Sequence, residues 1–182
     1  TGALGTGAVS IASGAALQFG GKADAGKLSI ANAGTLRLQD TASAAGATVT
    51  NAAGGQVRID LTTTGTSIGS LGGAGDVVLG TKTLTTGALG TDNTISGAIT
   101  GTTGSLVKVG AGTLTLSGTA NYAGETRVTG GTLKAGATNA FSAASSAVVA
   151  SGATLDLGGF SQKMAGLTNA GTVSLLGTVP GT

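Results

Sequence analysis

The sequence contains no cysteine, no histidine and no tryptophan among its 182 residues. Without cysteine the chain has no disulfide, so its fold has to be held together by packing alone. Without histidine it lacks the commonest general base and the commonest transition-metal ligand of proteins. These absences exclude a histidine-activated nucleophile, and we expect neither a metal nor another cofactor.

Charged and aromatic residues are also scarce. Only 9% of the residues are charged and 2% are aromatic, whereas about a quarter of an ordinary globular domain is charged. The nine Lys and Arg residues are scattered singly and the net charge is +2, so we expect no nucleic-acid partner. No apolar run approaches the roughly eighteen residues of a membrane-spanning helix.

Glycine and aliphatic residues take the place of what is missing. The chain has 36 glycines and is 40% hydrophobic, which argues against disorder, because disordered chains are poor in aliphatic residues. A core built from Leu, Val, Ile and Ala without large aromatic clusters has to be thin. We therefore expect one elongated domain over residues 1–182.

An aliphatic residue recurs about every twenty positions along the chain. Most of these residues open a short phrase in which apolar residues flank one residue of any kind. A fixed period of this size indicates a repeat architecture. The recurring residues are Leu17, Leu36, Val57, Val77, Ile95, Leu114, Leu133, Leu155 and Val173.

Each phrase follows a glycine-bearing corner, such as Asn32–Thr35 or Ser151–Thr154. A second short alternating run precedes the corner, for example Leu28–Ile30 or Val107–Val109. Alternation with period two places aliphatic side chains on one face of a strand and polar side chains on the other. One unit therefore reads as strand, tight corner, strand and return loop.

Such units bury a core only when they stack, because equivalent strands then pair in parallel. The sequence predicts an all-β fold, a right-handed single-stranded parallel β-helix of about nine coils, spanning roughly 40–45 Å at ~4.8 Å per coil. Asn32, Asn51 and Asn169 hold similar corner positions. We expect a partial amide ladder at the first two and a turn residue at Asn169.

A pair of carboxylates is the best candidate for an enzymatic site. Asp40 and Asp60 follow each other on successive predicted coils, and paired acids cleave glycosidic bonds in many enzymes. The predicted register, however, aligns Asp60 with Gln39 and stacks Arg37 on Arg58. The favoured interpretation is therefore charge compensation among the two arginines and Asp60.

Residues 104–136, GSLVKVGAGTLTLSGTANYAGETRVTGGTLKAG, form the most distinctive segment. This segment resembles the autotransporter-associated β-strand repeat, also called the passenger-associated transport repeat. It departs from the family in one respect, because Asn121 and Tyr122 are adjacent where relatives separate them by one residue. We expect Tyr122 to pack in the fold and not to contact a ligand. The motif residues that carry the resemblance are Lys108, Gly110, Gly112, Leu114, Leu116, Gly118, Asn121, Tyr122, Gly124, Thr126, Val128, Gly131 and Leu133.

The resemblance implies a β-helical passenger that a Gram-negative bacterium exports through a C-terminal outer-membrane barrel of the same full-length protein. Because Thr1 begins inside a repeat unit, we expect the chain to be a piece of a longer mature protein. The leading expectation is a non-enzymatic, surface-displayed or released stalk that supports export and adhesion. Two alternatives stay open. The chain is a module that binds a host receptor, extracellular matrix, a glycan or another copy of itself, or it is an enzyme that cleaves polysaccharide.

Overall fold

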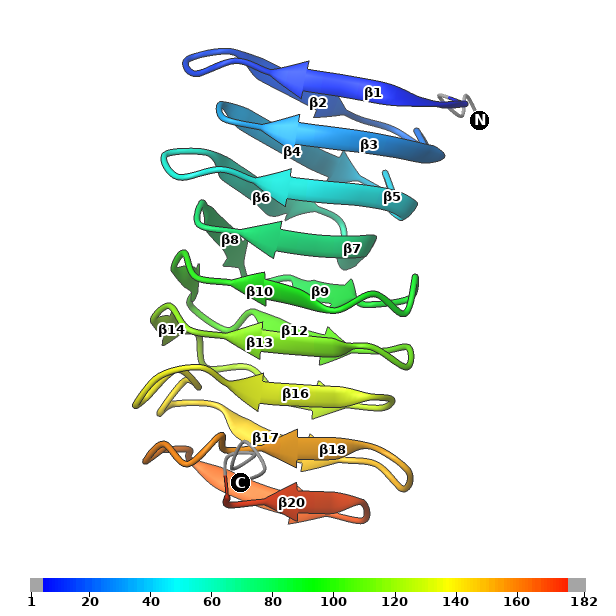
Figure 1. Cartoon of the computed structure of the whole chain (residues 1–182). Coiled ribbons are helices and arrows are strands. Elements are labelled where there is room, and N and C mark those ends of the chain that lie inside the picture. Colours follow the sequence, from blue (N-terminus) through cyan, green and yellow to red (C-terminus); the bar gives the residue numbers. More distant parts are fainter. Residues whose placement is uncertain (1–4, 177–182) are drawn as a thin grey trace, which may run out of the picture.

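The computed structural model describes residues 5–176, which form twenty β-strands and, within that range, no helix. All strand pairs are parallel and the coils stack into a β-solenoid of about eight turns. The front strands run to the left and the strands behind them to the right as the stack descends from the N-terminal coil (Figure 1), which makes the coil right-handed. The expected parallel β-helix is confirmed.

The first four coils each contribute two strands. Their front strands belong to a 14-stranded sheet and their back strands to a 6-stranded sheet. The front strands are β1 (Thr6–Ile11), β3 (Lys27–Asn32), β5 (Ala44–Asn51) and β7 (Gly65–Gly73). The 6-stranded sheet consists of β2 (Ala16–Phe19), β4 (Thr35–Asp40), β6 (Gln56–Thr62), β8 (Asp76–Gly80), β11 (Ile99–Gly101) and β14 (Ala120–Asn121).

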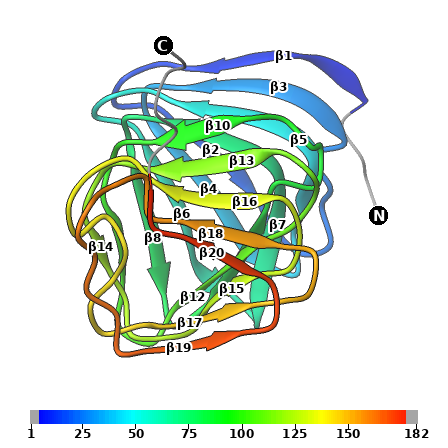
Figure 2. The same ribbon diagram turned by 60° about the horizontal axis from the view of Figure 1, so that its bottom comes forward.

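The large sheet divides at β7 into two arms. The first half of β7 pairs with β9 (Gly65 with Thr83 to Ile68 with Thr86), whereas Gly73 at its end pairs with Ile95 of β10. The two arms lie on different sides of the coil (Figure 2). One arm consists of β9 (Thr83–Thr86), β12 (Ser105–Lys108), β15 (Thr126–Val128), β17 (Ser146–Val149) and β19 (Gly166–Asn169). The other consists of β10 (Asn93–Ile95), β13 (Thr113–Leu116), β16 (Thr132–Ala135), β18 (Thr154–Asp156) and β20 (Thr172–Ser174).

The ladder between β5 and β7 is irregular where the two arms separate, between the pairs Ala44 with Ile68 and Thr48 with Ser70. Gly69 lies at the middle of the strand, where a Cβ atom would meet the backbone oxygens of Ala45 and Ala47 on the preceding coil. Only glycine fits such a close backbone approach. On the next coil, residues 87–92 form a corner between β9, which pairs with the first half of β7, and β10, which pairs with its end. The coils directly after the fork therefore contribute three strands each.

The fork corrects the register predicted from the twenty-residue recurrence. Val77 pairs with Ile99 and not with Ile95, whereas Leu114 pairs with Asn93 of the other sheet. Eight of the nine aliphatic positions therefore form two interior columns in two sheets, not one, and Ile95 aligns instead with Leu116. The recurrence misleads because the alternating apolar pattern is the same in the strands of every sheet. An added corner moves the pattern from one sheet to another without changing its period along the sequence.

The interior is aliphatic, as expected, and runs the length of the stack. A two-rung amide ladder interrupts it, because the buried Asn32 Nδ2 donates to Asn51 Oδ1 at 2.8 Å. Asn169 instead accepts a hydrogen bond from the Gly171 amide at 3.0 Å, as a turn residue does. Both predictions for these asparagines are confirmed. No helix within residues 5–176 is long and apolar enough to cross a membrane.

Candidate functional site

The motif residues begin on the second coil after the fork. They extend from β12 through β13, β14 and β15 to β16, so they make one full turn of the solenoid and begin the next. Each of these strands pairs with an equivalent strand on a neighbouring coil. The motif is therefore an internal layer of the stack, with coils on both sides of it.

Lys108 stabilises the corner between β12 and β13 from the interior of the coil. The residue is 1% exposed, and its Nζ donates to the carbonyl oxygens of Val109 at 2.8 Å, Gly110 at 2.9 Å and Gly130 at 3.1 Å. The first two oxygens belong to its own corner and the third to the corner of the next coil. An ammonium has three donors, and here each has a partner, so Lys108 joins two successive corners.

The burial of Lys108 reverses the prediction for residues 107–109. Alternation there suggests that Val107 and Val109 face inward, yet Lys108 is buried and both valines are half-buried. Lys108 turns inward because the carbonyl oxygens of the corner need hydrogen-bond donors, and the backbone amides of the strand ladder do not supply them. Burial lowers the pKa of Lys108, and the charge of Asp92 opposes that shift.

Tyr122 fills the interior behind β14. It is 1% exposed, and its hydroxyl shares a 2.7 Å hydrogen bond with Thr126 Oγ1 of β15. Thr126 in turn shares a 2.8 Å bond with Ser145 Oγ on the next coil. Burial raises the pKa of Tyr122 to about 12, with a smaller opposing effect from its bond to Thr126. The expectation that Tyr122 packs is confirmed.

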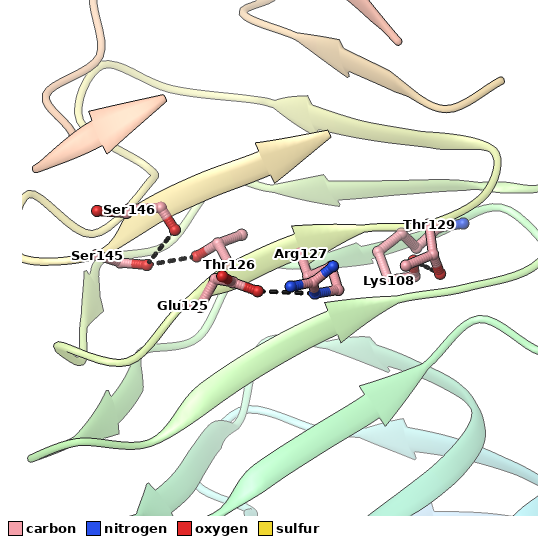
Figure 3. A network of polar contacts seen from close by, with 7 residues as sticks. All are labelled: Lys108, Glu125, Thr126, Arg127, Thr129, Ser145 and Ser146. Carbon is pink, nitrogen blue, oxygen red and sulfur yellow. Dashed lines mark hydrogen bonds and ion pairs between the residues drawn. The ribbon is translucent and has the colours of Figure 1, made fainter. Parts of the chain in front are cut away.

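The backbone of Tyr122 is tied to the next coil as well. Ser142 Oγ donates to the Tyr122 carbonyl at 2.6 Å, and the Tyr122 amide donates to Ser142 Oγ at 3.3 Å. Figure 3 shows the neighbouring part of this network, in which Ser145 reaches Thr126 from the adjacent coil, together with the separate ion pair between Arg127 and Glu125. The polar groups of the motif therefore bind coil to coil.

The remaining motif residues build the walls and corners of the layer. Leu114, Leu116, Val128 and Leu133 are buried, whereas Asn121 is exposed at the end of β14. Gly110 has a φ of 70°, a left-handed conformation that favours glycine. The other motif glycines lie against the backbone of the preceding coil, where a Cβ atom would collide: Gly112, Gly118, Gly124 and Gly131.

The space that borders the motif is interior and not an open cleft. An interior space beside Thr126 leaves no room for a water molecule, so it is packed core and not a ligand site. Within residues 5–176 no group of three or more acidic side chains is arranged to hold a metal ion. The space is lined by Thr126, Phe141, Ser142, Ser145, Ala147, Leu155 and Met164.

The two candidate acids are engaged in separate contacts. Asp60 accepts from Arg58 Nη2 at 2.6 Å and Arg58 Nε at 3.2 Å, and this bond, more than any other influence, lowers the pKa of Asp60. Asp40 Oδ2 accepts from the Gly21 amide at 2.8 Å. The predicted alignment of Asp60 with Gln39 is wrong, because a bulge shifts the ladder and Gln39 pairs with Leu61. The predicted stacking of Arg37 on Arg58 is confirmed.

Residues 106–135, which span β12 to β16, match the family model of the passenger-associated-transport-repeat. The chain carries an autotransporter passenger repeat. The passenger repeat contains all thirteen motif residues predicted from the sequence, from Lys108 to Leu133. No curated protein and no solved structure matches the chain.

The passenger repeat and the β-solenoid together fit the stalk of an autotransporter passenger. Membership in this repeat family also implies a secreted or surface-displayed protein. Sequence reasoning missed Ser142 and Ser145, the partners of the repeat on the next coil. Both lie in the Ser- and Ala-rich stretch 142–147, where nothing distinguishes the buried serines from the exposed ones.

Proposed function

We propose that the chain is a rigid, non-enzymatic stalk of an autotransporter passenger that supports export and carries adhesive surface. One observation carries this proposal. The passenger repeat is a continuous layer of the stack, tied to the following coil by Lys108 and by the Tyr122 network. A layer held in this way can stack on the preceding coil, and the following coil can stack on it in turn.

Export in one direction suits such a stack. Each coil contacts only its neighbours, so a coil that emerges outside the cell finds its complete binding surface on the coil already folded there. The absence of cysteine fits this process, since a disulfide formed before passage would block the chain. We propose the outer-membrane barrel of the same full-length protein as the export partner and the bacterial surface as the location.

Adhesion is the second part of the proposal. The described outer faces carry mixed chemistry, with single charges, amides and hydroxyls. A host-cell receptor, extracellular matrix, a glycan or a second copy of the chain would contact these faces. Saturable binding of the purified chain to host cells, or clumping of bacteria that display it, supports an adhesive module over a pure stalk.

The contacts of the acids favour a structural role over catalysis. A glycosidase needs one carboxyl with a raised pKa as general acid, whereas Arg58 lowers the pKa of Asp60. Hydrolysis of a glycan by the chain, lost in Asp40→Asn or Asp60→Asn, would contradict the non-enzymatic assignment.

Surface display of the chain tests the export role. The chain is fused upstream of an outer-membrane translocator barrel, and its exposure on intact cells is measured by added protease. Tyr122→Ala removes the interior network of the repeat and is expected to reduce display several-fold. Arg127→Gln is the matched control, because Arg127 is an exposed residue of the same repeat. Equal display of all three chains would contradict the role of the repeat in export.

A further inference from the structure

The outer face of the 6-stranded sheet carries two arginines in direct register. Arg37 of β4 pairs with Arg58 of β6, and Gln18 of β2 lies on the other side of Arg37. Neighbouring strands are ~4.8 Å apart, and like charges directly opposite each other destabilise a sheet. This arrangement therefore needs compensating negative charge.

Asp60 forms an ion pair with only one of the two arginines, and the charge of Arg37 is the smallest of the influences that lower the pKa of Asp60. The bulge in β6 brings Asp60 beside Arg58, with which it forms a two-bonded ion pair. Arg37 forms no ion pair among residues 5–176, and its buried Nε has no hydrogen-bond partner. The other acids near this sheet, Asp40 and Asp76, accept hydrogen bonds from the backbone amides of Gly21 and Ala98.

A guanidinium without an acceptor is an incomplete contact. Arginine presents several N–H donors in a fixed plane that matches the two oxygens of a carboxylate or the oxygens of a sulfate. Gln18 adds an exposed amide beside it, which can donate to one hydroxyl and accept from another. The donors and acceptors of these two side chains match an oxyanion attached to a hydroxyl-rich molecule.

We propose that Arg37, flanked by Gln18 and Arg58, binds an acid group of an acidic polysaccharide. This inference rests on the proposed adhesive function and names the ligand class of that surface. Other polymers fit the face less well. Arg37 lies on β4, which is paired on one side to β2 and on the other to β6, so an extended peptide cannot add a strand beside Arg37 itself.

Nucleic acid also fits poorly. The outward column through Arg37 holds no aromatic side chain on which a base could stack; it reads Gln18, Arg37, Arg58, Val78 and Thr100. One uncompensated cation suits a polymer with separated acid groups better than a continuous phosphate backbone.

Binding of defined polysaccharides to the whole chain tests the proposal. Hyaluronan supplies only carboxylates, dextran sulfate supplies only sulfates, and uncharged dextran is the blank. At low ionic strength we expect the chain to bind at least one of the two acidic polymers, and binding to weaken as salt screens the charges. The polymer that binds identifies the acid group.

Variants separate the site from general charge attraction. Arg37→Gln is expected to weaken binding about tenfold, the effect of losing a charge-assisted contact. Arg127→Gln lowers the net charge equally on another face and is expected to bind like the unchanged chain. Thermal melting of Arg37→Gln verifies that the variant is folded, which its half-buried, outward position favours.

Two results would overturn the inference. One is no binding of either acidic polymer at low salt. The other is an equal loss of binding in Arg37→Gln and Arg127→Gln, which would mean that only the net charge matters. Surface display of Arg37→Gln on the translocator fusion is measured separately. Normal display together with absent polysaccharide binding rejects the ligand and leaves the export role intact.

Discussion

Tyr122 should make the protein lose stability at alkaline pH by a predictable amount. The pKa of its hydroxyl rises from 10.0 to about 12 on folding because the ring is buried. The folded state therefore holds the proton more tightly than the unfolded chain does. The resulting contribution of Tyr122 to the free energy of unfolding is fully present below the pKa of the unfolded chain. It is lost as the pH rises from about 10 to about 12.

The size of this loss follows from the shift. One pKa unit corresponds to about 1.36 kcal/mol, so a shift from 10.0 to about 12 predicts a loss of roughly 2.7 kcal/mol across the interval. Tyr122→Phe removes the ionisation while keeping the ring in place. At neutral pH we expect this variant to be about 1 kcal/mol less stable, because it lacks the hydrogen bond to Thr126.

The assay is favourable because the chain has one tyrosine and no tryptophan. Tyrosinate absorbance therefore reports Tyr122 alone, while denaturant unfolding followed by circular dichroism gives the free energy of unfolding at each pH. Other titrating groups are shared by both chains, so they cancel in the difference between them. An ordinary tyrosine pKa in the folded protein, or equal pH dependence in Tyr122→Phe, would refute the reasoning.

Two further substitutions test the interior of the passenger repeat. Lys108→Met keeps the length of the side chain but leaves three carbonyls without their donor, and it should cost ~2 kcal/mol after allowance for the burial cost of the ammonium. An unchanged denaturation midpoint would show that these carbonyls need no cap. Leu116→Asp places an unpaired charge in the core, where Leu116 is 1% exposed, and should cost about 3–5 kcal/mol. Melting indistinguishable from that of the parent chain would place Leu116 outside the core.

The stack itself was predictable from the sequence because its determinants are local. Alternating phrases and glycine corners recur at every coil, and only parallel stacking buries their aliphatic residues. Leu114, Leu116 and Leu133 are therefore buried as predicted. The ladder of Asn32 and Asn51 was accessible for the same reason, since both residues precede equivalent corners.

The fork at β7 was not predictable from the same signals. A period of about twenty residues persists through it, although Val77 and Leu114 belong to different sheets. The fork coincides with an irregular ladder and a close backbone contact at Gly69, and a glycine in a chain with 36 of them carries no distinct signal. The inward side chain of Lys108 depends on the corner that the fork creates, so its orientation was also missed.

The fork limits how such a rod can change its length. The coils before β7 and those after it form two segments, in which each coil contacts only its immediate neighbours. In the first segment the coils pair strand for strand, so duplication or loss of one coil leaves two matching surfaces to rejoin. A junction that joins the two segments without β7 would set a two-stranded coil against a three-stranded one. One strand would then lack a partner for its backbone groups. Among the described strands, β7 is the one that pairs with three others, namely β5, β9 and β10. The coil that contains β7 is therefore the one that recombination between related rods has to retain.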